Sequence, residues 1–122
     1  MKTNNAFMLI LFSVCLFSAF SAQANTSEIQ HLINYVSNTQ CTYVRNGDKH
    51  TGKEAVEHIQ KKYDYFSDDI KTAEDFIRLS ATKSTFSGKP YKVICEGKTM
   101  DSAQWLLDEL KRFRQQVKKP TH

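Results

Sequence analysis

Apolar residues form one dense block near the N-terminus and then recur at regular spacing along the rest of the chain. The block, residues 6–20, follows Lys2 and precedes Ala22 and Ala24, which occupy the two small-residue positions before a cleavage site. This arrangement is typical of a secretory signal peptide. Because a membrane-spanning helix needs about 20 apolar residues, the block is short for an anchor. We expect cleavage after Ala24, a periplasmic or secreted location and no stable membrane insertion afterwards.

The remaining domain, residues 25–122, contains four segments whose apolar residues follow helical spacing. They predict helices over residues 28–38, 55–66, 70–81 and 103–117. Ser27 and Thr51 are each followed three residues later by Gln or Glu, the capping-box pattern of a helix start. Residues 67–69, one Ser and two Asp, predict the N-terminus of the third helix. Asp101 or Ser102 is expected to cap the last helix.

Two further segments, residues 41–45 and 91–95, alternate in side-chain character and predict β-strands. Asn46 and Gly47 favour a tight turn into a short, polar hairpin partner. These elements predict a single small α+β domain, with about four helices packed on a two- or three-stranded antiparallel sheet.

Two of the three cysteines, Cys41 and Cys95, follow the predicted cleavage site. In an oxidising compartment such a pair is expected to form a disulfide. Closing a loop of this length is worth about 4 kcal/mol in the chain-entropy model, against a total stability of roughly 5–15 kcal/mol for a typical domain. We therefore expect one structural disulfide.

Composition and charge narrow the classes of function. With 122 residues, 40% hydrophobic and 25% charged, the chain is neither disordered nor multidomain. Its 17 basic and 13 acidic residues give a net charge of +4, far from the strongly basic balance of a nucleic-acid binder. Several cations near the end of the last predicted helix suit the helix dipole, and contact with an anionic surface is the alternative. They are Lys111, Arg112, Arg114, Lys118 and Lys119.

The sequence contains no nucleotide-binding, hydrolase or metal-binding motif. His58 follows Glu54 by four positions, with Arg45 and His50 just before, so a small hydrolase or transferase using His58 and Glu54 is one alternative. The same spacing is that of ordinary neighbours on a solvated helix face. The histidines also lack the spacing that pre-organises zinc. We expect no enzymatic activity, no metal and no cofactor.

The polar loop of residues 82–90 is the most informative surface segment, because it is attached to the strand that carries Cys95. Within it, Ser87-Gly88-Lys89-Pro90-Tyr91 is similar to the S-G-x-x-Y loop motif of periplasmic lysozyme inhibitors, which are mainly β-proteins. An ordinary turn that starts a strand is the alternative. Together with the hairpin turn and the second helix, the loop supplies the candidate binding residues. They are Arg45, Asn46, His58, Phe86, Ser87, Gly88, Lys89 and Tyr91.

Four sequence blocks also occur together in a specific order. They are Tyr43-Val44-Arg45-Asn46-Gly47, Glu54-Ala55 with His58 and Lys62-Tyr63, Thr72-Ala73-Glu74-Asp75-Phe76-Ile77, and Ser87-Gly88-Lys89-Pro90-Tyr91. Over residues 28–112 the chain resembles the YfeK-like family of small secreted bacterial proteins, a domain of unknown function. The resemblance implies an exported protein of a Gram-negative bacterium, and it brings no reaction, cofactor or partner with it.

These observations predict a periplasmic or secreted, disulfide-stapled domain that binds another protein or a cell-envelope macromolecule and catalyses no reaction. Inhibition of a cell-wall lytic enzyme through the S-G-x-x-Y loop is the first alternative. The small hydrolase or transferase is the second.

Overall fold

The computed structural model describes residues 18–119, with side chains from Asn25 onward. Most of the predicted signal peptide, residues 1–24, lies outside the described residues, and only its backbone from Ser18 onward is placed, within the first helix. In chain order the elements are α1 (Ser18–Ser37), β1 (Thr42–Arg45), β2 (Asp48–His50), α2 (Gly52–Tyr65), the short 3₁₀ helix η2 (Ser67–Asp69), α3 (Ala73–Ser80), β3 (Lys92–Cys95), β4 (Lys98–Asp101) and α4 (Ser102–Lys118). The predicted α+β class is confirmed.

The four strands form one antiparallel sheet in the order β2-β1-β3-β4. Tyr43 pairs with Val93, and Val93 pairs with Met100 on the other side. Tyr43 and Val93 are both buried, so this row of side chains forms the helix-facing side of the sheet. The sheet has four strands, where the sequence predicted two or three, because polar β4 pairs with β3 over its whole length.

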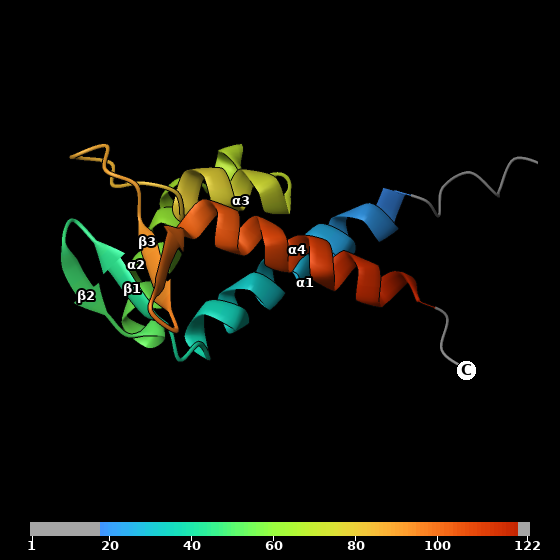
Figure 1. Ribbon diagram of the computed structural model, residues 1–122. Coiled ribbons are helices and arrows are strands. Elements are labelled where there is room, and N and C mark those ends of the chain that lie inside the picture. Colours follow the sequence, from blue (N-terminus) through green and yellow to red (C-terminus); the bar gives the residue numbers. More distant parts are fainter. Residues whose placement is uncertain (1–17, 120–122) are drawn as a thin grey trace, which may run out of the picture.

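The helices cover this sheet and extend away from it (Figure 1). α2 packs against β1 and β2, whereas α4 packs against β3 and β4. α1 contacts α2, α3 and α4, and its residues Leu32 and Val36 are buried in the shared core. The segment between α3 and β3 projects beyond the helices at the sheet end of the molecule (Figure 1). The β1–β2 turn, α2 and this projecting segment are therefore attached to the same core.

Capping residues explain where α2 and α3 begin. Thr51 caps α2 through the predicted reciprocal bonds with Glu54. The prediction that α3 starts at residues 67–69 is wrong, since those residues form η2 and the cap is Thr72, bonded reciprocally with Asp75. The extended backbone at Ile70 separates the two helices and allows this side chain to be buried.

α1 begins ten residues before the predicted start, at Ser18. Among the side chains of α1 that the structure describes, those from Asn25 onward, the first buried one is Ile29. The first turn of α2 lies directly against the C-terminal end of α1. A Cβ on Gly52 would lie 2.1 Å from the carbonyl oxygen of Val36. Only glycine permits this approach.

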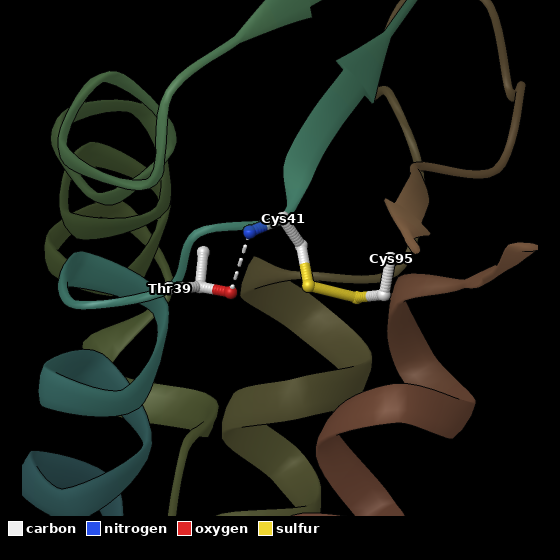
Figure 2. The surroundings of a disulfide bond; sticks show 3 residues. All are labelled: Thr39, Cys41 and Cys95. Atoms are coloured by element: carbon white, nitrogen blue, oxygen red, sulfur yellow. Dashed lines mark hydrogen bonds between the residues drawn. A yellow bond between two sulfur atoms is a disulfide. The ribbon is translucent and has the colours of Figure 1, made fainter. Parts of the chain in front are cut away.

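The predicted disulfide is present and joins Cys41, just before β1, to Cys95 at the end of β3. Figure 2 shows the bond crossing between the two neighbouring strands, with the backbone N–H of Cys41 donating to Oγ1 of Thr39 at 3.1 Å. The two Cα atoms lie 4.7 Å apart, one position beyond the paired residues Thr42 and Ile94. The disulfide thus fixes the register of the two central strands at the end opposite the Asn46-Gly47 turn.

Ion pairs hold the helical end together. The buried carboxylate of Glu109 accepts from Arg112 and lies 2.6 Å from Nε2 of His31 on α1. Arg114 donates to Glu28 on α1 and to Glu74 on α3. Of the five basic residues near the end of α4, Arg114 therefore joins this helix to α1 and α3, and Arg112 is paired with Glu109 of its own helix.

Candidate functional site

A cleft of about 490 Å³ opens where α2, the β1–β2 turn and the projecting loop meet. We call it the cationic cleft; its main lining residues are Arg45, His58, Lys61, Lys62, Ser84 and Phe86. None of the described residues that line it is acidic. It therefore brings together three cations, Arg45, Lys61 and Lys62, from two elements.

One face of α2 forms the wall of the cationic cleft. Lys61 and Lys62 follow His58 by three and four positions, and Tyr65 follows them by four and three, which places all four on the same side of the helix. The sequence analysis selected only His58 from this face. The helical spacing of the two lysines and the tyrosine was the signal that could have found the others.

The β1–β2 turn forms a second wall. Asn46 and Gly47 both have positive φ values, 53° and 83°, as the hairpin turn predicted from Asn-Gly requires. The turn places Arg45 at the cleft and points the Asn46 side chain at the projecting loop. The Asn46 amide donates to Oγ of Ser84 at 3.3 Å and accepts from Oγ of Ser87 at 2.6 Å.

The projecting loop is held in shape by its own hydrogen bonds. The N–H of Ser84 donates to the carbonyl of Lys89, and the N–H of Gly88 donates to the carbonyl of Ser84. The N–H of Ser87 donates to Oγ of Ser84, and the N–H of Lys89 donates to Oγ of Ser87. We call residues 84–89 the braced loop. Its Phe86 side chain is fully exposed, which is unusual for a large apolar residue on a fixed backbone.

The floor of the cationic cleft is a short chain of polar contacts. Nε2 of His58 lies 2.9 Å from the hydroxyl oxygen of Tyr91, and Nζ of Lys62 donates to the same oxygen at 3.4 Å. Lys62 also donates to the carbonyl of Lys83 at 2.7 Å. Since an ammonium group only donates, the Tyr91 proton is available to His58. The three side chains therefore fasten α2 to the start of the strand that follows the braced loop.

Burial and neighbouring cations set the protonation of this floor. Burial lowers the pKa of His58, and the nearby charges of Arg45, Lys62 and Lys61 lower it further. Burial also raises the pKa of the Tyr91 hydroxyl, against a smaller opposite effect of Arg45. At neutral pH His58 is an uncharged acceptor and Tyr91 an uncharged donor.

The proposed dyad of Glu54 and His58 is not assembled by the fold. Glu54 accepts from the backbone of Thr51 and lies 3.9 Å from Nδ1 of His50. It lines a separate cavity of about 660 Å³ at the disulfide end of the sheet, whereas His58 lines the cationic cleft. The arrangement needed for the predicted acid–base pair is absent from the described residues.

The fold gathers four candidate binding residues, Arg45, Asn46, His58 and Phe86, at the lining of the cationic cleft. Other candidates in the loop have different positions. Ser87 braces the loop through Asn46, and Tyr91 is buried, 1% exposed, with only its hydroxyl reaching the floor. The remaining two, Gly88 and Lys89, are exposed in the braced loop. The S-G-x-x-Y motif is thus split between a loop and the core.

The described residues contain neither a candidate membrane span nor a candidate metal site. No helix among them has the length and apolar character needed to cross a bilayer. Within the same part of the chain, no three or more His, Cys, Asp or Glu side chains are grouped so that they could hold a metal ion.

Comparisons with known proteins identify relatives. Residues 23–114 match the model of a family described as a family of unknown function, DUF5329. A stretch of 50 residues is 48% identical to the uncharacterized protein YfeK of Salmonella typhimurium, covering 41% of this chain and 42% of that protein. The aligned stretch thus spans less than half the length of this relative. No solved structure matches the chain. Because the family match covers most of the chain, including every strand and the cationic cleft, the protein belongs to the DUF5329 family, as its YfeK-like sequence blocks indicated.

Proposed function

We propose that this protein is an exported binding domain that captures an anionic partner of the cell envelope in the cationic cleft and catalyses no reaction. The observation that carries the proposal is the gathering of Arg45, Lys61 and Lys62 around a concave surface whose described lining holds no carboxylate. Like charges held close together repel one another. A bound anion relieves that repulsion, so the site favours a negatively charged partner.

The geometry favours binding over catalysis. His58, the one cleft residue suited to acid–base chemistry near neutral pH, has Nε2 next to the Tyr91 hydroxyl and no carboxylate to orient it. Its depressed pKa keeps it neutral. A positioned nucleophile paired with a base, which a hydrolase of this kind needs, is not seen among the described lining residues.

The proposed export is supported by the signal-peptide pattern and by the disulfide between Cys41 and Cys95. Disulfides persist mainly in oxidising compartments. On this proposal the domain that remains after cleavage at Ala24 keeps the buried residues Ile29, Leu32 and Val36 of α1 and the ion pair between Glu28 and Arg114.

Retention of envelope components on the immobilised domain tests the binding role. We compare the protein that starts at Asn25 with a cleft variant, Arg45→Glu with Lys61→Glu. Neither side chain has a hydrogen bond or ion pair recorded within the described residues, so the fold should tolerate both changes. A matched control, Lys53→Glu with Lys98→Glu, makes the same charge change at the disulfide end of the molecule.

The proposal expects an envelope component that the unaltered domain and the control variant retain and the cleft variant does not. Equal retention by all three proteins, or no retention above an empty support, contradicts it. Thermal unfolding of each variant shows whether a lost interaction reflects the cleft or a loss of folding.

A further inference from the structure

We propose that the braced loop and the cationic cleft dock together on a bilayer surface that contains anionic phospholipids, with Phe86 entering the interface and the headgroup phosphates meeting the cations. This inference rests on the proposed function and specifies its anionic partner. It concerns peripheral contact only, because no described helix can cross the membrane.

Phe86 is the first observation. Its side chain is fully exposed near the tip of a loop that projects beyond the helices at the sheet end of the molecule (Figure 1). Tyr65, on the facing wall of the same cleft, is 82% exposed. Exposed aromatic residues that project from a surface are suited to the boundary between headgroups and acyl chains, where Trp and Tyr rings concentrate. Phe86 and Tyr65 therefore add two exposed aromatic side chains to the lining of the cationic cleft.

The backbone of the braced loop is the second observation. Moving a peptide group out of water is costly unless its hydrogen bonds are made internally. Four backbone N–H groups of the loop already have acceptors within it, those of Ser84, Ser87, Gly88 and Lys89. The braced loop can therefore approach the headgroups with four of its six backbone N–H groups already bonded, and Asn46 holds it in one orientation.

The distribution of charge is the third observation. Lys83 and Lys89 lie at the two ends of the braced loop and are exposed, and they extend the positive surface of the cationic cleft. Each Lys or Arg close to an anionic membrane contributes about fivefold to binding. Cations beside a projecting aromatic side chain match a surface of many phosphates with an apolar layer beneath.

An acidic protein is the other class of partner with suitable charge. Such a partner would need a recess that fits the projecting Phe86, whereas a bilayer interface accepts an aromatic side chain at any point on its surface. The bilayer therefore accounts for the exposed ring with fewer requirements, and the acidic protein becomes an outcome of the test.

Co-sedimentation with vesicles tests the inference on the domain that starts at Asn25. One set of vesicles contains equal parts of phosphatidylglycerol and phosphatidylcholine, and the other contains phosphatidylcholine alone. We expect binding to the anionic vesicles only. The change Phe86→Ser should weaken it about tenfold, since the ring loses its apolar burial. The cleft variant, Arg45→Glu with Lys61→Glu, should weaken it by about 25-fold or more, because two cations are lost.

Two matched controls distinguish binding through this surface from nonspecific binding to vesicles. Val117→Ser removes an exposed apolar side chain from the far end of α4, and Lys53→Glu with Lys98→Glu reverses two charges at the disulfide end. Both should bind as the unaltered domain does. A Phe86→Trp variant adds a direct readout, because its emission should shift to the blue and resist acrylamide quenching when vesicles are added. Inorganic phosphate in excess should not compete if the bilayer, and not the free anion, is the ligand.

Absence of vesicle binding, or binding that Phe86→Ser leaves unchanged, overturns the inference. The proposed function has a separate outcome: if a protein from the envelope is retained through the cationic cleft while vesicles are not, the acidic-protein partner is correct and only the bilayer is excluded. If the cleft variant retains the same envelope components as the unaltered domain and also binds vesicles equally well, both proposals fail.

Discussion

The hydroxyl of Tyr91 lies 2.9 Å from Nε2 of His58, although the two residues are 33 positions apart in the chain. The contact joins the middle of α2 to the residue that follows the projecting loop. Because Tyr91 is buried and its hydroxyl contacts His58, which lines the cationic cleft, a core residue and a residue of the cleft share one hydrogen bond. The position of the braced loop relative to the cleft therefore depends on the packing of the core.

Tyr91→Phe should reduce the free energy of unfolding by about 1 kcal/mol. The change keeps the ring in the core and removes the group that bonds to His58 and Lys62. A hydrogen bond of this kind contributes about 1 kcal/mol net. Urea unfolding of the two proteins measures the difference. Tyr65→Phe is the control, because the Tyr65 side chain is 82% exposed and should change nothing; equal effects of the two changes would show that the Tyr91 hydroxyl has no structural role.

Reduction of the disulfide should destabilise the domain that starts at Asn25 by about 4 kcal/mol, the chain-entropy value for a loop of this length. The sequence separation of Cys41 and Cys95 is 54 residues. Urea unfolding with and without dithiothreitol measures the loss. A variant with both cysteines changed to Ala should show the same reduced stability and no response to dithiothreitol. Identical stability in oxidised and reduced forms contradicts the prediction.

Arg45→Gln should raise the pKa of His58. Burial is the largest cause of the depressed pKa, and the charge of Arg45 is the next. The His58 ring resonances, followed by NMR across a pH titration, report the pKa directly. Lys98→Gln, which removes a cation from the far end of the sheet, should leave the His58 titration unchanged.

The same depressed pKa predicts a loss of stability in mild acid. Unfolded histidine has a pKa of about 6.5, so below that pH the unfolded state binds the proton more readily than the folded state does. Stability therefore falls as the pH decreases through this range and is unaffected well above it. His58→Gln should remove this part of the pH dependence, and a slope that the variant retains in full assigns it to another group.

Glu109→Gln should lower stability at neutral pH and reduce the further loss on strong acidification. Hydrogen bonds from Arg112 hold the pKa of the Glu109 carboxyl below its usual range against the effect of burial, and His31 adds a smaller contribution. A depressed carboxyl pKa stabilises the fold above the unfolded pKa of about 4.3, and this stabilisation disappears as the pH falls through the folded value. Unfolding between pH 7 and pH 3 measures both effects. Asp108→Asn is the control, since Asp108 is an exposed carboxylate on the same helix.

Expression of the full chain in a Gram-negative host should yield a protein whose N-terminal residue is Asn25. Ala22 and Ala24 provide the small side chains that a signal peptidase requires. Intact mass of the protein released from the periplasm gives the cleavage position and shows whether the two thiols are oxidised. Replacing Ala24 with a bulky residue should block processing at that position, and an unprocessed wild-type chain would contradict the predicted signal peptide.

Local signals in the sequence predicted the fold well where neighbours within four residues decide the structure. The Thr51 cap, the Asn46-Gly47 turn and the α+β class are of this kind. The Cys41–Cys95 disulfide was predictable for another reason, because only two cysteines follow the expected cleavage site. β4 was missed since its residues are polar and do not alternate, and it becomes a strand only by pairing with β3.

The cationic cleft could be predicted only in parts. Arg45, His58 and Phe86 were chosen from their separate segments, but nothing local shows that a turn, a helix and a loop converge on one surface. The sequence by itself determined the caps, the turn, the pair of cysteines and the residue types available for chemistry. The tertiary structure alone decided that Glu54 and His58 line different cavities, that Tyr91 is buried and that the lysines of α2 and Arg45 line one cleft. The physical reason is that caps and turns are closed by adjacent peptide groups, whereas the cleft depends on packing between elements distant in the sequence, such as the β1–β2 turn and the braced loop, whose Asn46 and Ser87 are 41 positions apart.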